Sequence, residues 1–235
     1  MNFIDKNLEE YVEKHTEQEP KLLTKLNKIT HQTVLQPRML SGHFQGRLLS
    51  FLSKLVSPNK ILEIGSYEGA STCFLIETLS LYHDSFEIYA IDTWDGGVEH
   101  KEMKINMKLV EEKFHKNTSL AIKNSSKKID LVTYKDKSIN ALSKLITNQK
   151  SNYFDFIYID GSHMASDVLS DAILSFELLK INGIIGFDDY LWKLPNTNNL
   201  LTNPKIAIDS FTNIFALRSS IFRTPNHQVY IKKTS

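Results

Sequence analysis

The chain contains very little cysteine, only Cys73 among 235 residues. A single thiol cannot form an internal disulfide, and it cannot hold zinc without other ligands. The sequence therefore predicts a protein of the reducing cytoplasm. The opening residues MNFIDKNLEE carry no basic stretch followed by an apolar one, so no signal peptide is expected. No apolar run is long enough to cross a bilayer, so no membrane association is expected either.

An excess of charge of one sign is also missing. The chain has 28 Lys and Arg against 27 Asp and Glu, which gives a net charge of +1. Without a basic surface there is no electrostatic reason to expect a nucleic-acid partner. The phosphate-binding pattern G-x-x-x-x-G-K-[ST] is absent, which argues against a nucleoside triphosphatase. The absence of G-x-S-x-G argues against a hydrolase with a nucleophile elbow.

What is present is an alternation of short apolar runs and amphipathic stretches. The pattern predicts strands at 60–65, 86–92, 129–134, 154–160, 183–189, 218–223 and 227–232. It predicts helices at 5–35, 44–56, 69–79, 99–117, from 138 onward, at 166–179 and at 204–216. This order predicts an α/β protein with a Rossmann-like, doubly wound and mainly parallel seven-stranded sheet. Residues 1–56 form the expected N-terminal helical extension, a cover for a cofactor or a dimer contact, and 57–235 form the main domain.

The segment LEIGSYEGAS carries the first sign of a ligand site. Gly65 and Gly69 lie in the turn between a strand and a helix, where a missing Cβ lets backbone approach a ligand or a helix start close to a strand. Asp92 ends the next strand, where a carboxylate can accept hydrogen bonds from both ribose hydroxyls. Glu63 would repel a pyrophosphate but suits a cationic ligand. The set favours an adenosine-containing cofactor over the alternative of an ordinary glycine turn.

Three carboxylates follow two predicted strands. Asp160 ends the strand at 154–160, and Asp188 with Asp189 ends the strand at 183–189. If these strands are neighbours, the three side chains meet at one edge of the sheet, about 5 Å from strand to strand. Like charges at that distance repel one another, so the side chains need protonation, outward rotation or a cation. Oxygen ligands suit Mg²⁺, Mn²⁺ or Ca²⁺. Turn and helix-cap roles remain the alternative for each aspartate.

The motifs ILEIGSYEGAST and IYAIDTWDGG resemble motifs I and II of the class I S-adenosylmethionine-dependent methyltransferases. SGHFQGRLL is similar to the segment before the first strand in O-methyltransferases of the catechol and caffeoyl-CoA type. The resemblance implies that Asp92 holds the ribose and that Trp94 packs on the adenine. It carries Ser138 over as an adenine-side residue. It implies that the methionine end is lined by Glu63, Gly65, Ser66 and Ser71.

The resemblance also bears on the carboxylates. FDDYLW resembles the metal-binding segment of macrolide and aminocoumarin sugar O-methyltransferases, and DYLW also resembles the catechol type. It implies that Asp160, Asp188 and Asp189 bind a divalent cation, most simply Mg²⁺. His163 stands where catechol-type enzymes place a lysine, so it is the candidate catalytic base beside Asp160.

These patterns predict S-adenosylmethionine-dependent, cation-assisted O-methylation of a small-molecule hydroxyl. Two rivals stay open. One is an NAD-type oxidoreductase on a related fold, which the glycine spacing disfavours. The other is a relative that binds the cofactor without catalysis, which the intact carboxylate set disfavours. The identity of the substrate does not follow from the sequence.

Overall fold

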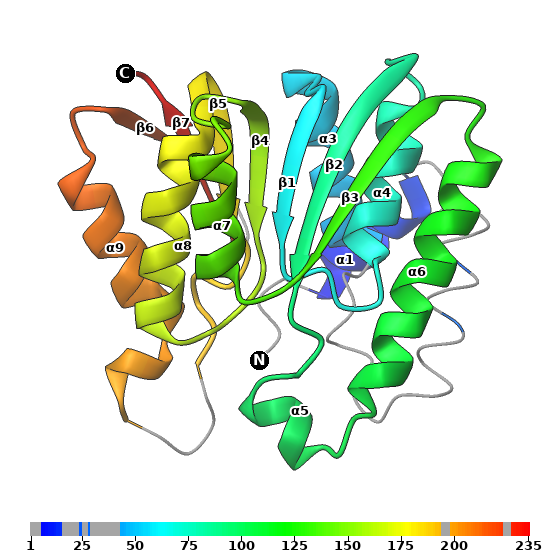
Figure 1. Cartoon of the computed structure of the whole chain (residues 1–235). Helices are drawn as coiled ribbons and strands as arrows, with labels where there is room; N and C mark the ends of the chain where they lie inside the picture. The colour runs from blue at the N-terminus through cyan, green and yellow to red at the C-terminus, as the bar shows by residue number, and fades with distance from the viewer. Residues whose placement is uncertain (1–5, 16–23, 25–27, 29–42, 194–197, 223–226) are drawn as a thin grey trace. The chain divides into compact units, whose positions relative to one another are not determined.

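The computed structural model describes residues 6–15, 24, 28, 43–193, 198–222 and 227–235. Seven strands form one sheet in the order β3-β2-β1-β4-β5-β7-β6 (Figure 1). Their bounds are β1 Lys60–Ile64, β2 Ser85–Asp92, β3 Lys128–Lys135, β4 Phe154–Ile159, β5 Leu179–Phe187, β6 Ser219–Phe222 and β7 Val229–Lys233. The pairs β1–β2, β1–β4 and β4–β5 are parallel, whereas β7 is antiparallel to both β5 and β6. The predicted mainly parallel, doubly wound α/β sheet is confirmed.

Contacts within the chain divide it into two compact units. One unit comprises residues 58–65, 87–93 and 130–235, and therefore holds nearly all of the sheet. The other comprises residues 1–57, 66–86 and 94–129. We call them the sheet unit and the helical unit. These units interleave along the sequence, so the predicted division at residue 56 stays a prediction.

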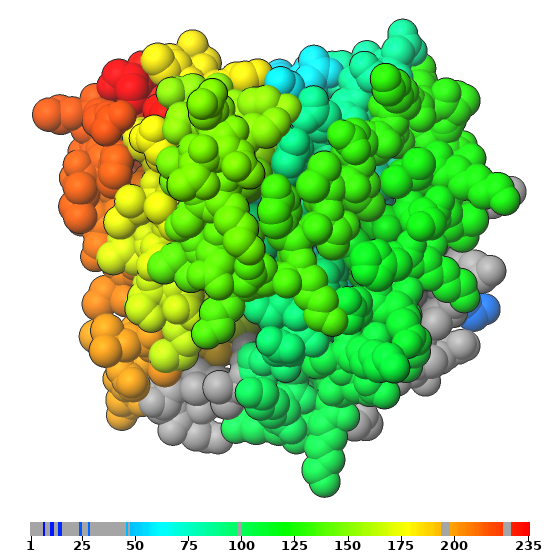
Figure 2. All heavy atoms as spheres, in the orientation of Figure 1, coloured from blue at the N-terminus to red at the C-terminus, as the bar shows by residue number. Residues whose placement is uncertain are grey.

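The sheet unit packs three helices on one sheet face: α7 (Ser138–Thr147), α8 (Ala165–Leu178) and α9 (Pro204–Ile214) (Figure 1). Figure 2 shows their outer sides as adjacent bands from green to orange. Between sheet and helices lies an apolar cluster of strand residues such as Ile157 and Ile185 and helix residues such as Leu142, Phe176 and Phe211. Ala172 and Phe176 of α8 are one turn apart, so the same stripe faces the sheet.

The helical unit contains α1 (Lys6–His15), α3 (His43–Val56), α4 (Ala70–Leu79), α5 (Val98–Glu102) and α6 (Met107–Asn124). Gly46 of α3 lies against the ring of Phe74 in α4, where a Cβ would come within 2.3 Å of a ring carbon. On α6 the buried residues Val110, Phe114, Thr118 and Ala121 recur at helical spacing. None of the helices in the described part of the chain is long and apolar enough to cross a membrane.

The carboxyl ends of four adjacent strands are joined by backbone hydrogen bonds. The Gly65 amide donates to Ile91 O at 2.8 Å, Asp160 N donates to Ile64 O at 2.8 Å, and Asp188 N donates to Ile159 O at 3.0 Å. The residue after each strand is thereby fixed to its neighbour. Gly65, Asp160 and Asp188, three of the residues that the sequence predicts to be functional, lie in this row.

Two predicted elements differ from the structure. The predicted helix at 99–117 is two helices, α5 and α6, because Lys104 adopts a left-handed φ of 52° and the Asn106 side chain caps α6 at Leu109 N. The predicted strand at 183–189 begins earlier, at Leu179, with a register shift against β4. Most of the predicted helix at 5–35 lies outside the described residues, which there comprise 6–15, 24 and 28.

Candidate active site

Asp160, Asp188 and Asp189 come together in the sheet unit. Asp160 follows β4, and the other two follow β5, its parallel neighbour. The pairing of β4 with β5 confirms the strand adjacency that the sequence predicts. A small cavity beside these carboxylates is walled by apolar side chains that include Phe187, Val168 and Ile208.

Crowding by neighbouring carboxylates contributes to the raised pKa values of Asp160 and Asp188. Burial, followed by the charges of Asp188, Asp189 and Glu63, raises the pKa of Asp160 well above its usual range. Burial and the charge of Asp189 raise the pKa of Asp188, against hydrogen bonds from Gln228 and Tyr158 that lower it. The fully ionised cluster is therefore unfavourable without a compensating positive charge.

Asp188 is held by a buried polar network. Its Oδ1 accepts a hydrogen bond from the Tyr158 hydroxyl at 2.7 Å and another from the Gln228 side-chain amide. The same Gln228 accepts from the Tyr230 hydroxyl at 2.8 Å. Gly186 lies between the two rings, where a Cβ would come within 2.6 Å of Tyr230. The missing side chain at this position gives both tyrosines room to reach the network.

Asp189 is held differently, by His163 in the loop after β4. His163 Nε2 lies 3.0 Å from Asp189 Oδ2, and both side chains are about four-fifths buried, with 20% and 22% exposed. The indole of Trp192 stacks on the imidazole with ring centroids 3.8 Å apart. The predicted base thus lies beside a predicted metal ligand, fixed on two sides.

His227 also belongs to this cluster, and the sequence analysis missed it. One ligand atom each from Asp188, Asp189 and His227 lie within 4.8 Å of one another. That set does not include Asp160, although the charges of both aspartates act on Asp160. A signal existed: antiparallel pairing of the predicted strands 183–189 and 227–232 places His227 opposite the aspartate pair.

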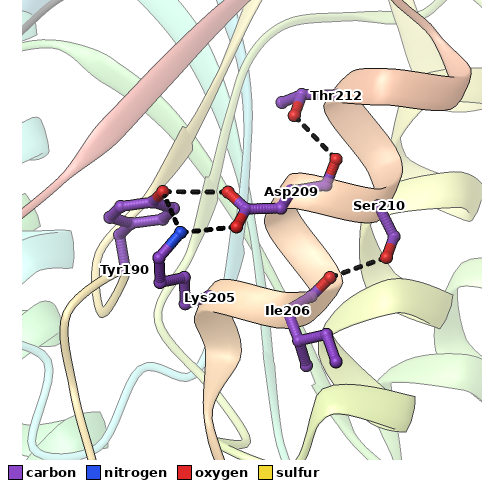
Figure 3. A network of polar contacts seen from close by, with 6 residues as sticks. All are labelled: Tyr190, Lys205, Ile206, Asp209, Ser210 and Thr212. Atoms are coloured by element: carbon purple, nitrogen blue, oxygen red, sulfur yellow. Dashed lines mark hydrogen bonds and ion pairs between the residues drawn. The ribbon is translucent and has the colours of Figure 1, made fainter.

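The backbone after the aspartates is tied to α9 by a polar network (Figure 3). The Tyr190 hydroxyl donates to Asp209 Oδ1 at 2.8 Å, and the Lys205 ammonium contacts both Tyr190 and Asp209. The Tyr190 amide donates to His227 O at 3.1 Å. These contacts fix the loop that carries Asp188 and Asp189 on both sides.

Four predicted cofactor residues lie in the sheet unit. Glu63 is fully buried near the end of β1, and its charge acts on Asp160. Gly65 has a φ of 86°, and a Cβ there would come within 2.0 Å of Asp160 O. The close approach is thus to protein backbone, not only to a ligand as the sequence suggests. Asp92 is half-buried at the end of β2, and Ser138 begins α7.

The other four lie in the helical unit. Ser66 and Ser71 are buried, and Ser66 O accepts a hydrogen bond from Gly69 N at 2.7 Å. Gly69 caps α4 with a φ of 84° and faces Phe114 of α6. Trp94 is only 3% exposed; its ring packs on Phe114, and its Nε1 donates to Tyr67 O at 2.9 Å. Its expected contact with adenine stays a prediction.

The sequence of residues 62–190 matches the family described as methyltransferase domain, which is more than half of the chain. This chain belongs to the methyltransferase domain family. The match spans the glycine turn and all three aspartates. It supports the methyltransferase hypothesis over the NAD-type oxidoreductase.

Relatives of this methyltransferase domain include the probable caffeoyl-CoA O-methyltransferase 3 of Dictyostelium discoideum. It is 32% identical over 154 residues, which is 66% of this chain and 53% of that protein. A caffeoyl-CoA O-methyltransferase of Populus kitakamiensis is 28% identical over 63% of this chain and 54% of its own length. The matched part of the chain therefore spans about half the length of these relatives.

Solved structures share the fold. The O-methyltransferase TomG of Streptomyces achromogenes, in complex with SAM, has a TM-score of 0.71 at 16% identity, covering 97% of this chain and 96% of that one. An O-methyltransferase of Bacillus cereus, in complex with SAH, has a TM-score of 0.70 at 18% identity, covering 97% of each chain. At these identities the likeness establishes the fold of this methyltransferase domain.

Proposed function

We propose that the protein is an S-adenosylmethionine-dependent O-methyltransferase that uses a divalent cation and acts on a small-molecule hydroxyl. The observation that carries the proposal is the convergence of Asp160, Asp188 and Asp189 at adjacent strand ends of a methyltransferase domain. The names of the caffeoyl-CoA O-methyltransferase relatives and of the O-methyltransferase structures support O-methylation in particular.

The residues at the strand ends fit a cation. Asp160 and Asp188 have pKa values raised by burial and by neighbouring carboxylates, so a positive charge would relieve their repulsion. Carboxylate oxygens are the ligands that Mg²⁺ and Mn²⁺ prefer. When bound, such an ion supplies Lewis-acid stabilisation of a developing oxyanion. We propose Asp160, Asp188 and Asp189 as the residues that hold it.

Glu63 and Asp92 fit S-adenosylmethionine. A buried carboxylate at Glu63, whose charge acts on Asp160, would be stabilised by the positive charge of the cofactor's methionine end. Asp92 ends β2 and is half-buried, so its carboxylate can accept hydrogen bonds from the ribose hydroxyls. Gly65, Ser66, Gly69, Ser71, Trp94 and Ser138 complete the proposed cofactor set.

His163 is the proposed proton acceptor. Its Nε2 lies 3.0 Å from Asp189 Oδ2, so the carboxylate would stabilise the imidazolium that forms when the ring takes the hydroxyl proton. Trp192 stacks on the ring and limits its rotation. The chain's own contribution is thus to orient the ring and to move a proton at the acceptor oxygen.

We also propose a cytoplasmic location for the protein and a role for its N-terminal segment. Cys73 is fully buried, and the sequence offers no second cysteine for a disulfide, which suits the reducing cytoplasm. We propose that residues 1–56 cover the cofactor or form a homodimer contact.

The test uses the whole chain, S-adenosylmethionine with a labelled methyl group, Mg²⁺ or Mn²⁺, and a panel of hydroxyl compounds that includes caffeoyl-CoA. We expect label transfer that requires cation and falls steeply in a His163→Ala variant. Calorimetry with S-adenosylhomocysteine measures cofactor binding separately. Failure of the wild-type protein to bind this product would overturn the proposal.

A further inference from the structure

The two residues before β7, His227 and Gln228, lie opposite the aspartate pair. Phe187 of β5 pairs with Val229 of β7, and the Tyr190 amide still donates to His227 O beyond that pair. Continued by two residues, this antiparallel register sets Gln228 opposite Asp188 and His227 opposite Asp189. Gln228 indeed hydrogen-bonds to Asp188. The pairing of β5 with β7 thus places the imidazole of His227 beside the carboxylates of Asp188 and Asp189.

The resulting cluster combines two carboxylates with one imidazole. Ligand atoms of Asp188, Asp189 and His227 lie within 4.8 Å of one another, a separation that a single ion can bridge. His227 is half-buried, and its charge acts on Asp188. Tyr158 and Gln228 fix Asp188, and His163 contacts Asp189, so each carboxylate is oriented by a neighbour. Oriented ligands lose less entropy when they bind an ion.

We propose that His227 is a nitrogen ligand of the cation, and that the site therefore prefers a transition-metal ion such as Mn²⁺ to Mg²⁺ or Ca²⁺. Mg²⁺ and Ca²⁺ take oxygen ligands almost exclusively, whereas imidazole suits Mn²⁺, Fe²⁺ and their neighbours. The inference rests on the proposed function, because it concerns the cation of that same site. It adds a ligand that the three-aspartate set lacks and changes the ion expected there.

The alternative role for His227 is structural. An imidazole beside two carboxylates can stabilise them as a hydrogen-bond donor, without contacting an ion. The two roles differ in metal coordination. Only as a ligand does His227 bond a nitrogen atom directly to the metal. The experiment is therefore built on metal binding and its spectrum, with no cofactor or acceptor present.

The protein is freed of metal with a chelator and titrated with Mn²⁺ and with Mg²⁺, and free Mn²⁺ is followed by electron paramagnetic resonance. We expect the wild type to bind Mn²⁺ more tightly than Mg²⁺ and to show ¹⁴N modulation in the electron spin echo of bound Mn²⁺. His227→Gln and His227→Asn should lose the nitrogen modulation and weaken Mn²⁺ binding roughly tenfold or more, with a much smaller effect on Mg²⁺. The two variants guard against a folding defect in either one.

The matched control is His83→Asn. His83 lies in the helical unit, and its Nε2 is 3.1 Å from Ser57 Oγ. This variant should keep both the Mn²⁺ affinity and the nitrogen signal. Mn²⁺ binding in both His227 variants with unchanged affinity and an unchanged nitrogen signal would overturn the inference alone. A wild-type protein that binds neither ion would overturn it together with the cation part of the proposed function, and label transfer in chelator would then test the rest.

Discussion

At the amino ends of the strands, Asp155 of β4 accepts hydrogen bonds from the backbone amides of Asn59 and Lys60 and from the Lys180 ammonium, at 2.6 to 3.0 Å. At the carboxyl ends of the same strands, Asp160 has the charges of three other carboxylates acting on it. Both aspartates belong to the sheet unit, only five residues apart. One is compensated by cationic and amide partners, and the other is crowded by like charges.

The amino end repeats this compensation around Tyr153. Its hydroxyl donates to Glu87 at 2.5 Å, and the ammonium groups of Lys60 and Lys150 lie 3.8 and 3.6 Å from its ring centroid. Such groups join the starts of neighbouring strands and need no ligand. The difference between the two ends indicates where a cation would contribute to stability as well as to chemistry.

The largest effect should come from removing one carboxylate charge at each end of the strands. Asp160→Asn should lower label transfer by about 100-fold or more, because it removes a proposed cation ligand. Without cation at pH 8 the variant should be more resistant to denaturant than the wild type, because one crowded charge is gone. Methyl-transfer assays and urea unfolding measure the two outcomes.

The matched variant Asp155→Asn should behave in the opposite way. It should keep cation binding and lose about 1–3 kcal/mol of stability, because two backbone amides and a lysine lose their carboxylate partner. Equal responses of the two variants to cation would remove the distinction between the two ends.

A smaller effect should follow from removing one hydroxyl at each end. Tyr158→Phe removes a hydrogen bond to Asp188 and should weaken cation binding roughly 10- to 100-fold. Tyr153→Phe removes the bond to Glu87, and should cost about 1 kcal/mol of stability with no change in cation affinity. Calorimetric titration with Mn²⁺ distinguishes them; a Tyr158→Phe variant with wild-type affinity would show that the hydroxyl does not orient the ligand.

The third prediction tests whether every buried carboxylate with a raised pKa marks a ligand site. Asp171 of α8 is buried, and its Oδ1 has no hydrogen-bond partner among the described residues. Burial raises its pKa to about 7, against a hydrogen bond with Ser138 that lowers it. In the unfolded chain such a group titrates near pH ~3.9. Because the folded state holds the proton more tightly, stability should fall as the pH rises from about 4 to about 7, and stay lowered above that.

Asp171→Asn removes this loss. The variant should unfold at nearly the wild-type urea concentration near pH 4 and at a higher one at pH 8, whereas the exposed Asp130→Asn should match the wild type at both. Divalent cation should have the same effect on the wild type and on Asp171→Asn. A cation effect that disappears in Asp171→Asn would extend ligand binding beyond the carboxyl ends of the strands.

The sequence predicts the strands and the position of the three aspartates at strand ends well, because both depend on local patterns. Apolar runs identify β4 and β5, and the residue after each run is at the carboxyl end of its strand. His227 escapes such reasoning because its position depends on the register between segments about 40 residues apart. The orientation of Trp94 escapes it too, because the left-handed backbone at that residue, with a φ of 48°, turns the indole toward Phe114. The sequence predicts that Gly65 allows a close approach, and the backbone that approaches it in the structure is that of Asp160.

The pairing of β7 with β5 also has a consequence for folding. Gln228 reaches Tyr158 across 70 residues of sequence and Asp188 across 40. Closing a long chain segment between two contacting residues costs conformational entropy, so contacts between residues far apart in sequence form late in folding. A refolding intermediate with β1 to β5 assembled would already bring the three aspartates together but would lack His227 and Gln228. In a refolding experiment, the appearance of tight Mn²⁺ binding would then show when β7 pairs with β5.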